Sequence, residues 1–249
     1  MSQTRLHEQL LQLFSERNSQ NLNLCLEHPD FNSFETKHSL SIPMSDLVLS
    51  FTHTSFSHEY EVPHQELSEF FGDAVVQLIV TAELMRLYPN EKEGRLSRLR
   101  SFIVNEKTLA RLARGLNLQD LILVGKGEYK KELHLQDTVL SDTLEALMAT
   151  IFQNHGLEGS SKLLLKWLNE FVSDVFSMDN LENYDAKSKL QEATLAKYKT
   201  LPRYSADTLT EGFLVKVYVN DEVVAEGTFS SKKIGERELA RKVLENKVF

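Results

Sequence analysis

The chain has 249 residues, of which 41% are hydrophobic, and this is enough to bury the core of one or two domains. It contains no apolar run that approaches the ~18 residues of a membrane span, and its N-terminus lacks the apolar segment of a signal peptide. The single cysteine, Cys25, excludes an intrachain disulfide framework and a cysteine-based zinc site. We therefore expect a cytoplasmic protein without a membrane partner.

The formal net charge of −8 is unevenly distributed. Residues 184–249 contain 12 Lys and Arg against 10 Asp and Glu, a net charge of +2, which leaves −10 for the remainder. An acidic body that binds a metal, followed by a mildly basic tail, fits this distribution. The tail is less basic than most nucleic-acid-binding modules, so charge alone does not identify the partner.

The first stretch, residues 1–40, carries the weakest signal. Leu6, Leu10, Leu11 and Phe14 recur at helical spacing and indicate one amphipathic helix. The sequence that follows them is polar and broken. We treat residues 1–40 as an N-terminal extension of unknown role.

Three histidines precede the first strongly periodic segment. His53, His58 and His64 are five and six positions apart, which fits no ordinary zinc pattern. We therefore expect His53 to have a structural role.

An acidic helix is expected after Pro63, because apolar residues recur at helical spacing from there to about Tyr88. Glu66, Glu69 and Asp73 stand at positions i, i+3 and i+7, so a helix places their carboxylates on one stripe. These like charges repel one another, and folding alone does not require them. A divalent cation does, because Mg²⁺ is bound by oxygen ligands. An acidic, solvated helix face is an equal alternative from these residues alone.

Two shorter motifs follow this helix. A second helix is expected to start after Gly94, with Glu93 just ahead of it, where an acid also complements the helix dipole. Residues 125–128, Gly-Lys-Gly-Glu, predict a loop. The loop lacks the Gly-Lys-Ser/Thr ending of a phosphate-binding loop, so we do not expect it to bind a nucleotide.

A second acidic helix is expected over residues 140–152, where Asp142 and Glu145 stand at i and i+3 among apolar residues. Two acids inside a largely buried helix require partners or a metal. Asp142 alone could cap the helix N-terminus, but this alternative does not account for Glu145. A helix over residues 157–176, with Trp167 in the core, completes a segment in which all the strong periodicities are helical.

The tail changes character. Residues 178–186 are polar and indicate a linker, and Asn220-Asp221 is a tight-turn signal. Apolar residues in this tail recur with the period of 3.6 typical of a helix, or with the period of 2 typical of a strand. The pattern predicts a helix, three strands and a final helix, at residues 187–199, 204–207, 213–220, 223–229 and 231–247.

The start of the last predicted helix favours an anion. Free N–H groups, the helix dipole and two ammonium groups would converge there. The residues concerned are Ser230, Ser231, Lys232 and Lys233.

These motifs carry a family resemblance. HQELSEFFGDAVV (residues 64–76) resembles the signature of the ribonuclease III family, usually N-E-R-L-E-F-L-G-D-A-V-L. LSDTLEALMATIF (residues 140–152) resembles that family's second acidic motif, usually L-A-D-T-V-E-A-L-I-G. The two motifs in this order and at this separation are strongly specific. The α-β-β-β-α tail resembles the double-stranded-RNA-binding domain that follows the nuclease domain in this family.

The resemblance implies a fold and its boundaries. An all-α endonuclease domain is expected over residues 41–177, followed by a linker over 178–186. A small α+β (α-β-β-β-α) double-stranded-RNA-binding domain is expected over 187–249.

The resemblance also implies an activity. The chain would be an endoribonuclease that depends on Mg²⁺, with Mn²⁺ as a substitute, and cleaves double-stranded RNA to leave 5′-phosphate and 3′-hydroxyl ends. Glu69, Asp73, Asp142 and Glu145 would hold the metal, with Asp73 and Glu145 the catalytic residues. The metal would polarise the scissile phosphate and activate a water molecule. Structured precursors of rRNA and mRNA are the expected substrates.

The remaining expectations from the resemblance concern the surroundings of the site. Glu66 and Glu93 would lie at the periphery of the active site, and Gln191 would contact a ribose 2′-hydroxyl. The chain would form a homodimer with one active site for each RNA strand. Phe70 is our candidate for the dimer interface, with ordinary core packing as the alternative. Ser68 replaces an apolar residue beside Glu69, a departure from the family pattern.

Overall fold

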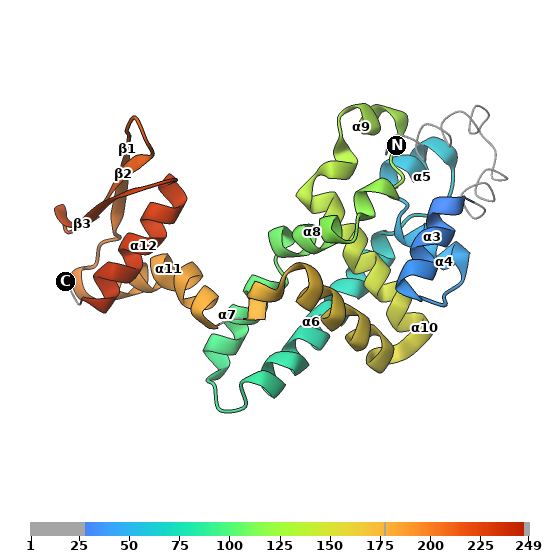
Figure 1. Cartoon of the computed structure of the whole chain (residues 1–249), viewed down its shortest axis with the longest axis horizontal. Coiled ribbons are helices and arrows are strands. Elements are labelled where there is room, and N and C mark those ends of the chain that lie inside the picture. Colours follow the sequence, from blue (N-terminus) through green and yellow to red (C-terminus); the bar gives the residue numbers. More distant parts are fainter. Residues whose placement is uncertain (1–27, 177, 247–249) are drawn as a thin grey trace. The chain divides into compact units, whose positions relative to one another are not determined.

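The computed structural model describes residues 28–176 and 178–246, and only the backbone of 178–185 and 188. The chain divides into two compact units between Val175 and Phe176. The first unit is helical, and the second contains a three-stranded sheet with α-helices (Figure 1). This confirms the expected fold class, an all-α domain followed by an α-β-β-β-α domain. No described helix is long and apolar enough to cross a membrane.

The first unit consists of α-helices and short 3₁₀ turns. Its α-helices are α3 (Pro29–His38), α4 (Met44–Ser50), α5 (Thr54–Tyr60), α6 (Glu66–Leu87), α7 (Glu93–Ile103), α8 (Glu106–Gly115), α9 (Lys126–Lys130) and α10 (Asp137–Phe171). Its 3₁₀ turns are η1 (Leu118–Asp120), η2 (Leu133–Leu135) and η3 (Ser173–Phe176), the last of which crosses the unit boundary.

Helix α10 is the centre of the first unit, because it packs along both α6 and α8. Between Val139 and Ile151 nearly every residue of α10 is buried, as expected for a helix surrounded by other helices. Helix α6 is buried on one stripe only, which includes Val76, Ile79 and Val80. The pairing of α6 with α10 brings the two acidic segments of the sequence side by side.

The two helices expected at residues 140–152 and 157–176 form one bent helix. The bend lies at Gly156, whose φ of 63° and ψ of −168° are not helical. Glycine adopts a positive φ without the steric cost of a Cβ atom, so the bend occurs where the sequence permits it.

The structure corrects our interpretation of residues 28–38 as polar and broken. Pro29 does not interrupt a helix but begins α3, at a position where its missing N–H is not needed. Phe31 and Phe34 pack edge-to-face on Phe51, and His38 lies edge-on to the buried Trp167. The helix therefore belongs to the core of the first unit. The amphipathic helix expected near Leu6 to Phe14 lies outside the described residues.

Two other segments form helices that the sequence analysis did not predict. The loop predicted at residues 125–128 is a one-turn helix, α9, with Gly125 as its N-cap. The polar segment 178–186, predicted to be a linker, is the first part of α11, which runs from Met178 to Tyr198.

The second unit is an antiparallel sheet in the order β1-β2-β3, packed against α12. Its strands are β1 (Arg203–Thr208), β2 (Phe213–Val219) and β3 (Glu222–Phe229), and its helices are α11 and α12 (Lys232–Glu245). The tight turn expected at Asn220-Asp221 is confirmed: both residues have positive φ, and Val219 pairs with Glu222 across a two-residue loop. Buried side chains from both helices and from β2 form its core: Ala186, Leu190, Val215, Val217, Leu239, Ala240 and Val243.

Candidate metal centre

The first acidic segment, which contains Glu69, forms the first turns of α6, as expected. The backbone N–H of Gln65, the residue just before α6, donates to the carbonyl of Thr52 at 3.0 Å, which fixes the start of the helix. Glu69 then lies one turn further along, on the side of α6 that faces α10.

The second acidic segment lies inside α10 and not at its start. The helix begins at Asp137, so Asp142 does not act as an N-cap, and the alternative that we left open for it is excluded. Asp142 and Glu145 are both half-buried and stand at i and i+3, so they point to the same side of the helix.

Gly72 allows the two helices to approach closely at this point. A Cβ atom on Gly72 would lie 1.8 Å from the backbone carbonyl oxygen of Glu145, a distance that no side chain could occupy. The absence of a side chain at Gly72 therefore brings the backbones of α6 and α10 together beside the acids. An isolated glycine within a helical pattern was the only sequence signal for this contact.

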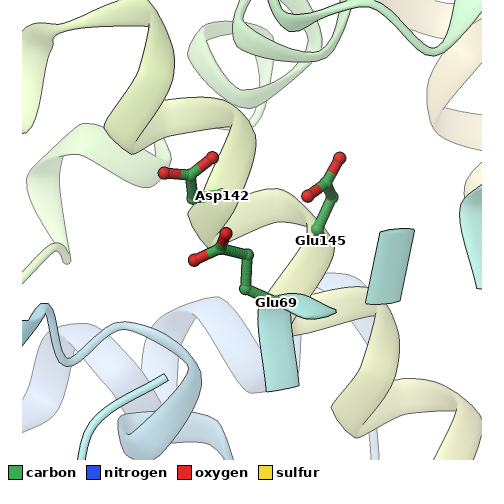
Figure 2. Close-up of side chains that lie close together, drawn as sticks. All are labelled: Glu69, Asp142 and Glu145. Carbon is green, nitrogen blue, oxygen red and sulfur yellow. The ribbon is translucent and has the colours of Figure 1, made fainter. Parts of the chain in front are cut away.

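Three carboxylates converge from the two helices. Glu69, Asp142 and Glu145 each offer an oxygen atom, and these atoms lie within 4.8 Å of one another. Figure 2 shows Glu69 reaching from α6 towards the pair on α10. The structure thus brings together three of the four acids that the sequence suggested as metal ligands.

The carboxylates disfavour one another's charge. Burial raises the pKa of Glu145 to about 8, with further contributions from Asp73, Asp142 and Glu69. Burial and neighbouring carboxylates also raise the pKa of Glu69. Burial raises the pKa of Asp142, although a hydrogen bond from Ser141 acts in the opposite direction.

This donor set fits a divalent cation. Within the described part of the chain, the side-chain carboxylates of Glu69 and Glu145 form no hydrogen bond or ion pair, so nothing compensates their charges there. Clustered, half-buried carboxylates without a cation are costly, and a cation among them would lower that cost. The donors are all oxygen atoms, the preference of hard ions such as Mg²⁺.

Asp73, the fourth expected ligand, is near Glu145 but is hydrogen-bonded to a neighbour on its own helix and is not one of the three converging carboxylates. Both of its carboxylate oxygens accept hydrogen bonds from the side-chain amide of Gln77, at 2.9 Å each. Gln77 follows Asp73 by four residues on α6, so the pair forms along one helix face. The sequence placed Asp73 on the acidic stripe correctly but did not reveal that Gln77 would compete for it.

The two peripheral acids do not join the cluster. Glu66 is exposed and lies 3.8 Å from the imidazole of His64. Glu93 is the first residue of α7, where it accepts a hydrogen bond from Ser97 at 2.9 Å. It lines a cavity of about 610 Å³ between α6 and α7.

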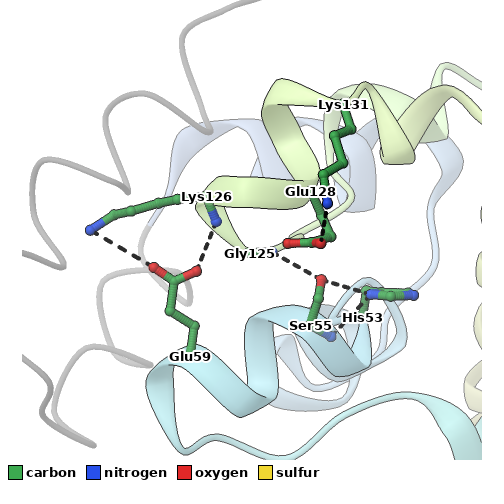
Figure 3. Close-up of polar contacts among 7 residues, drawn as sticks. All are labelled: His53, Ser55, Glu59, Gly125, Lys126, Glu128 and Lys131. Atoms are coloured by element: carbon green, nitrogen blue, oxygen red, sulfur yellow. Dashed lines mark hydrogen bonds and ion pairs between the residues drawn. The ribbon is translucent and has the colours of Figure 1, made fainter.

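His53 has the structural role that the sequence favoured. Its Nδ1 accepts a hydrogen bond from the backbone N–H of Ser55 and so caps α5 (Figure 3). Burial lowers the pKa of His53, which favours the neutral imidazole that this bond requires. The Ser55 hydroxyl in turn accepts from the N–H of Gly125 at 3.0 Å, and Glu59 accepts from the N–H of Lys126. This network fixes α9 to α5.

The expected RNA contacts lie on the surface of the second unit. Ser231 caps α12 by accepting a hydrogen bond from the N–H of Ile234 at 3.3 Å. Lys232 and Lys233 follow in the first turn and are exposed, and the ammonium of Lys232 lies over the ring of Phe213. Two further candidates, Ser230 and Gln191, are also exposed.

Phe70 is not part of the core. Its side chain is 80% exposed, and Leu67 one turn earlier is 83% exposed. Core packing, the alternative for Phe70, is therefore excluded within this chain.

Comparison with known proteins identifies the family of this chain. A family model described as "Ribonuclease-III-like" matches residues 46–171. A Ribonuclease 3 of Borreliella burgdorferi is 34% identical over 221 residues, which cover 84% of this chain and 89% of that protein. A Ribonuclease 3 of Corynebacterium efficiens is 36% identical over 200 residues, which cover 78% and 80%.

A solved structure from the same family is also similar to this chain. The nuclease domain of ribonuclease III from Campylobacter jejuni aligns with a TM-score of 0.53 and 33% identity, over 56% of this chain and 96% of that one. The chain belongs to the ribonuclease III family. It is accordingly an endoribonuclease that acts on double-stranded RNA, in a family that depends on divalent metal.

Proposed function

We propose that the chain hydrolyses double-stranded RNA at the carboxylate cluster of α6 and α10, with Mg²⁺ as the working ion. The convergence of Glu69, Asp142 and Glu145 from two helices is the observation that carries this proposal. Mn²⁺ would substitute, because it accepts the same oxygen donors. The products would carry 5′-phosphate and 3′-hydroxyl ends.

The proposed roles follow from the positions of the acids. A divalent ion bound here would polarise the scissile phosphate and lower the pKa of a water molecule. Glu145 is the most buried of the three acids and would be a direct ligand. Glu69 and Asp142 would hold the ion from either side. Asp73 would join them as the fourth ligand after exchanging the amide of Gln77 for the ion.

The second unit would bind the duplex by its backbone and shape. Base edges of duplex RNA lie in a deep, narrow groove, so recognition uses phosphates and 2′-hydroxyls. Lys232 and Lys233, with Ser230 and Ser231, would contact phosphate at the start of α12. Gln191 would contact a 2′-hydroxyl from α11.

A homodimer would place one such site against each RNA strand. The outer face of α6 supports this, because its exposed side chains include Leu67, Phe70, Leu78 and Met85, which follow one another along the helix. Apolar side chains that remain exposed in one chain are typical of an interface. The C. jejuni domain likewise has a region involved in dimer formation, according to its description.

We place this activity in the cytoplasm, in the processing of structured RNA precursors such as those of rRNA and mRNA. A metal-dependent duplex nuclease acts wherever such precursors fold on themselves, and the sequence of the precursor matters less than its helical shape.

The experiment is cleavage of a labelled RNA duplex of about 30–40 base pairs, long enough for the ~16 base pairs that such a domain spans. The chain would be assayed with Mg²⁺, with Ca²⁺ and as the Glu145→Ala variant. We expect discrete cutting with Mg²⁺ that disappears in the variant while binding persists.

The matched control is Glu158→Ala, which removes an exposed carboxylate from the same helix and should leave cutting unchanged. Tight binding without any cutting by the original chain would instead identify an RNA-binding protein that has lost catalysis. Loss of cutting in both variants would exclude a specific role for Glu145.

A further inference from the structure

The carboxylate cluster lies between two contacts that join α6 to α10. Gln65, Glu69 and Gly72 stand at i, i+4 and i+7, so they share one face. At one end, Gly72 lies directly against the backbone of Glu145. At the other, the Nε2 of Gln65 lies 3.5 Å from the hydroxyl oxygen of Thr143. Both contacts end on the acidic turn of α10.

The Gln65 side chain is enclosed and has a defined partner. It is 3% exposed, and Thr143 is fully buried. The Thr143 hydroxyl donates to the carbonyl of Val139 at 2.8 Å, which leaves its lone pairs free to accept from the Gln65 amide. The amide therefore links the start of α6 to the residue that follows Asp142.

Stability does not explain why an amide stands at this position. The Oε1 atom of Gln65 is buried and accepts no hydrogen bond from the described residues. An unpaired buried acceptor costs more than one long hydrogen bond returns. An apolar side chain of the same length would fill the space without that cost.

We propose that Gln65 is a positioning residue whose bond to Thr143 sets the separation of Glu69 from Asp142 and Glu145. The inference rests on the metal site of the proposed function. Mg²⁺ demands near-ideal geometry at about 2.0–2.1 Å, whereas Ca²⁺ tolerates longer and less regular coordination. Removal of the bond therefore weakens Mg²⁺ binding more than Ca²⁺ binding.

The test measures the binding of Mg²⁺ and of Ca²⁺ to the full chain without RNA, through the rise in melting temperature that each ion produces. The variants are Gln65→Met, Thr143→Val and the two combined. Each single variant weakens Mg²⁺ binding about tenfold, at the lower end of the range for groups that support metal ligands. The double variant is no weaker than either single one, because the same bond is removed.

Two further variants separate positioning from packing. Thr150→Val makes the same substitution seven residues later on α10, at a residue that is 3% exposed, and leaves the affinity for both ions unchanged. Gln65→Asn keeps the amide, which the usual family signature carries at this position, and it retains more of the Mg²⁺ affinity than Gln65→Met does. The Mg²⁺ concentration for half-maximal cleavage rises in the variants that lose Mg²⁺ affinity and stays unchanged in Thr150→Val.

An unchanged preference for Mg²⁺ over Ca²⁺ in Gln65→Met, with a gain in stability, would overturn the inference and identify Gln65 as a space-filling residue. Additive losses in the double variant would also overturn it. Failure of the original chain to bind either ion would instead remove the proposed metal site itself.

Discussion

The two units of this chain present charge in opposite ways. In the helical unit, Glu69, Asp142 and Glu145 are drawn into a half-buried seam between two helices, where the pKa of Glu145 rises to about 8. In the α-β-β-β-α unit, Lys232 and Lys233 lie exposed at the start of one helix. The first arrangement depends on packing and on an ion, whereas the second depends on surface charge. Mutations should therefore separate catalysis from RNA binding.

The sharpest separation is expected for Glu145→Gln. The neutral amide keeps the size of the side chain but removes a charged ligand, so cleavage should fall by more than the roughly 10–100-fold cost of losing an outer-shell partner. Affinity for the RNA duplex, measured in Ca²⁺ by filter binding or gel shift, should change little. Equal losses of cleavage and binding would show that the two units are not separable in this way.

The next largest effect concerns Gly72→Ala. The added Cβ collides with the Glu145 backbone, so the helices must separate, at a cost of about 1–3 kcal/mol in the free energy of unfolding. Metal binding should weaken as well, because the carboxylates move apart with the helices.

The matched control for this variant is Gly94→Ala, where a Cβ on helix α7 meets nothing within 4 Å. It should be neutral or stabilise the protein by about 0.5–1 kcal/mol, since alanine is the better helix former. Chemical denaturation of both variants gives the comparison. Equal stability of the two would contradict the close contact between α6 and α10.

The lysine pair provides the opposite experiment. Lys232→Ala combined with Lys233→Ala should weaken RNA binding and reduce the dependence of log affinity on log salt concentration by about one for each phosphate that the variant no longer neutralises. The cleavage rate at saturating RNA should be retained, because the carboxylate cluster is untouched. An unchanged salt dependence would exclude these lysines from the RNA interface.

The last comparison is a dependence of stability on pH. In the folded chain without metal, the pKa of Glu145 lies above its ordinary value of 4.5, at about 8. The folded state therefore binds the proton more tightly than the unfolded state, so stability is highest below pH 4.5 for this group and is lost as pH rises to about 8.

Thermal melts in EDTA should show this decline, and Glu145→Gln should reduce it. Mg²⁺ should oppose the decline, because it favours the carboxylate form. The raised pKa of Glu145 would be contradicted if the melting temperature of the original chain increased between pH 4.5 and about 8 while that of Glu145→Gln did not.

Much of this organisation could be predicted from the sequence, because it depends on periodicity. The carboxylates of Glu69, Asp142 and Glu145 were expected on two helices, and the strand and turn pattern of the second unit was expected within a few residues. What could not be predicted depends on packing and on side-chain conformation. Asp73 shares the helical stripe of Glu69, but its rotamer, held by Gln77, is not encoded in that spacing.

Some local sequence signals were misleading because the same residue type is suited to two different local structures. The segment around Pro29 was described as polar and broken, yet a proline is well suited to the first turn of a helix, and α3 is then held in place by Phe31 and Phe34. Gly125 was interpreted as part of a loop, yet it begins a short helix fixed by Ser55. The segments concerned are short, so tertiary contacts outweigh their sequence preferences.

The most direct test of the central claim is the anomalous scattering of Mn²⁺ in crystals of the full chain. We predict an anomalous peak within coordination distance of Glu69, Asp142 and Glu145. Its absence in crystals of a preparation that cleaves RNA with Mn²⁺, or a peak at another set of residues, would contradict the assignment of this cluster as the metal centre.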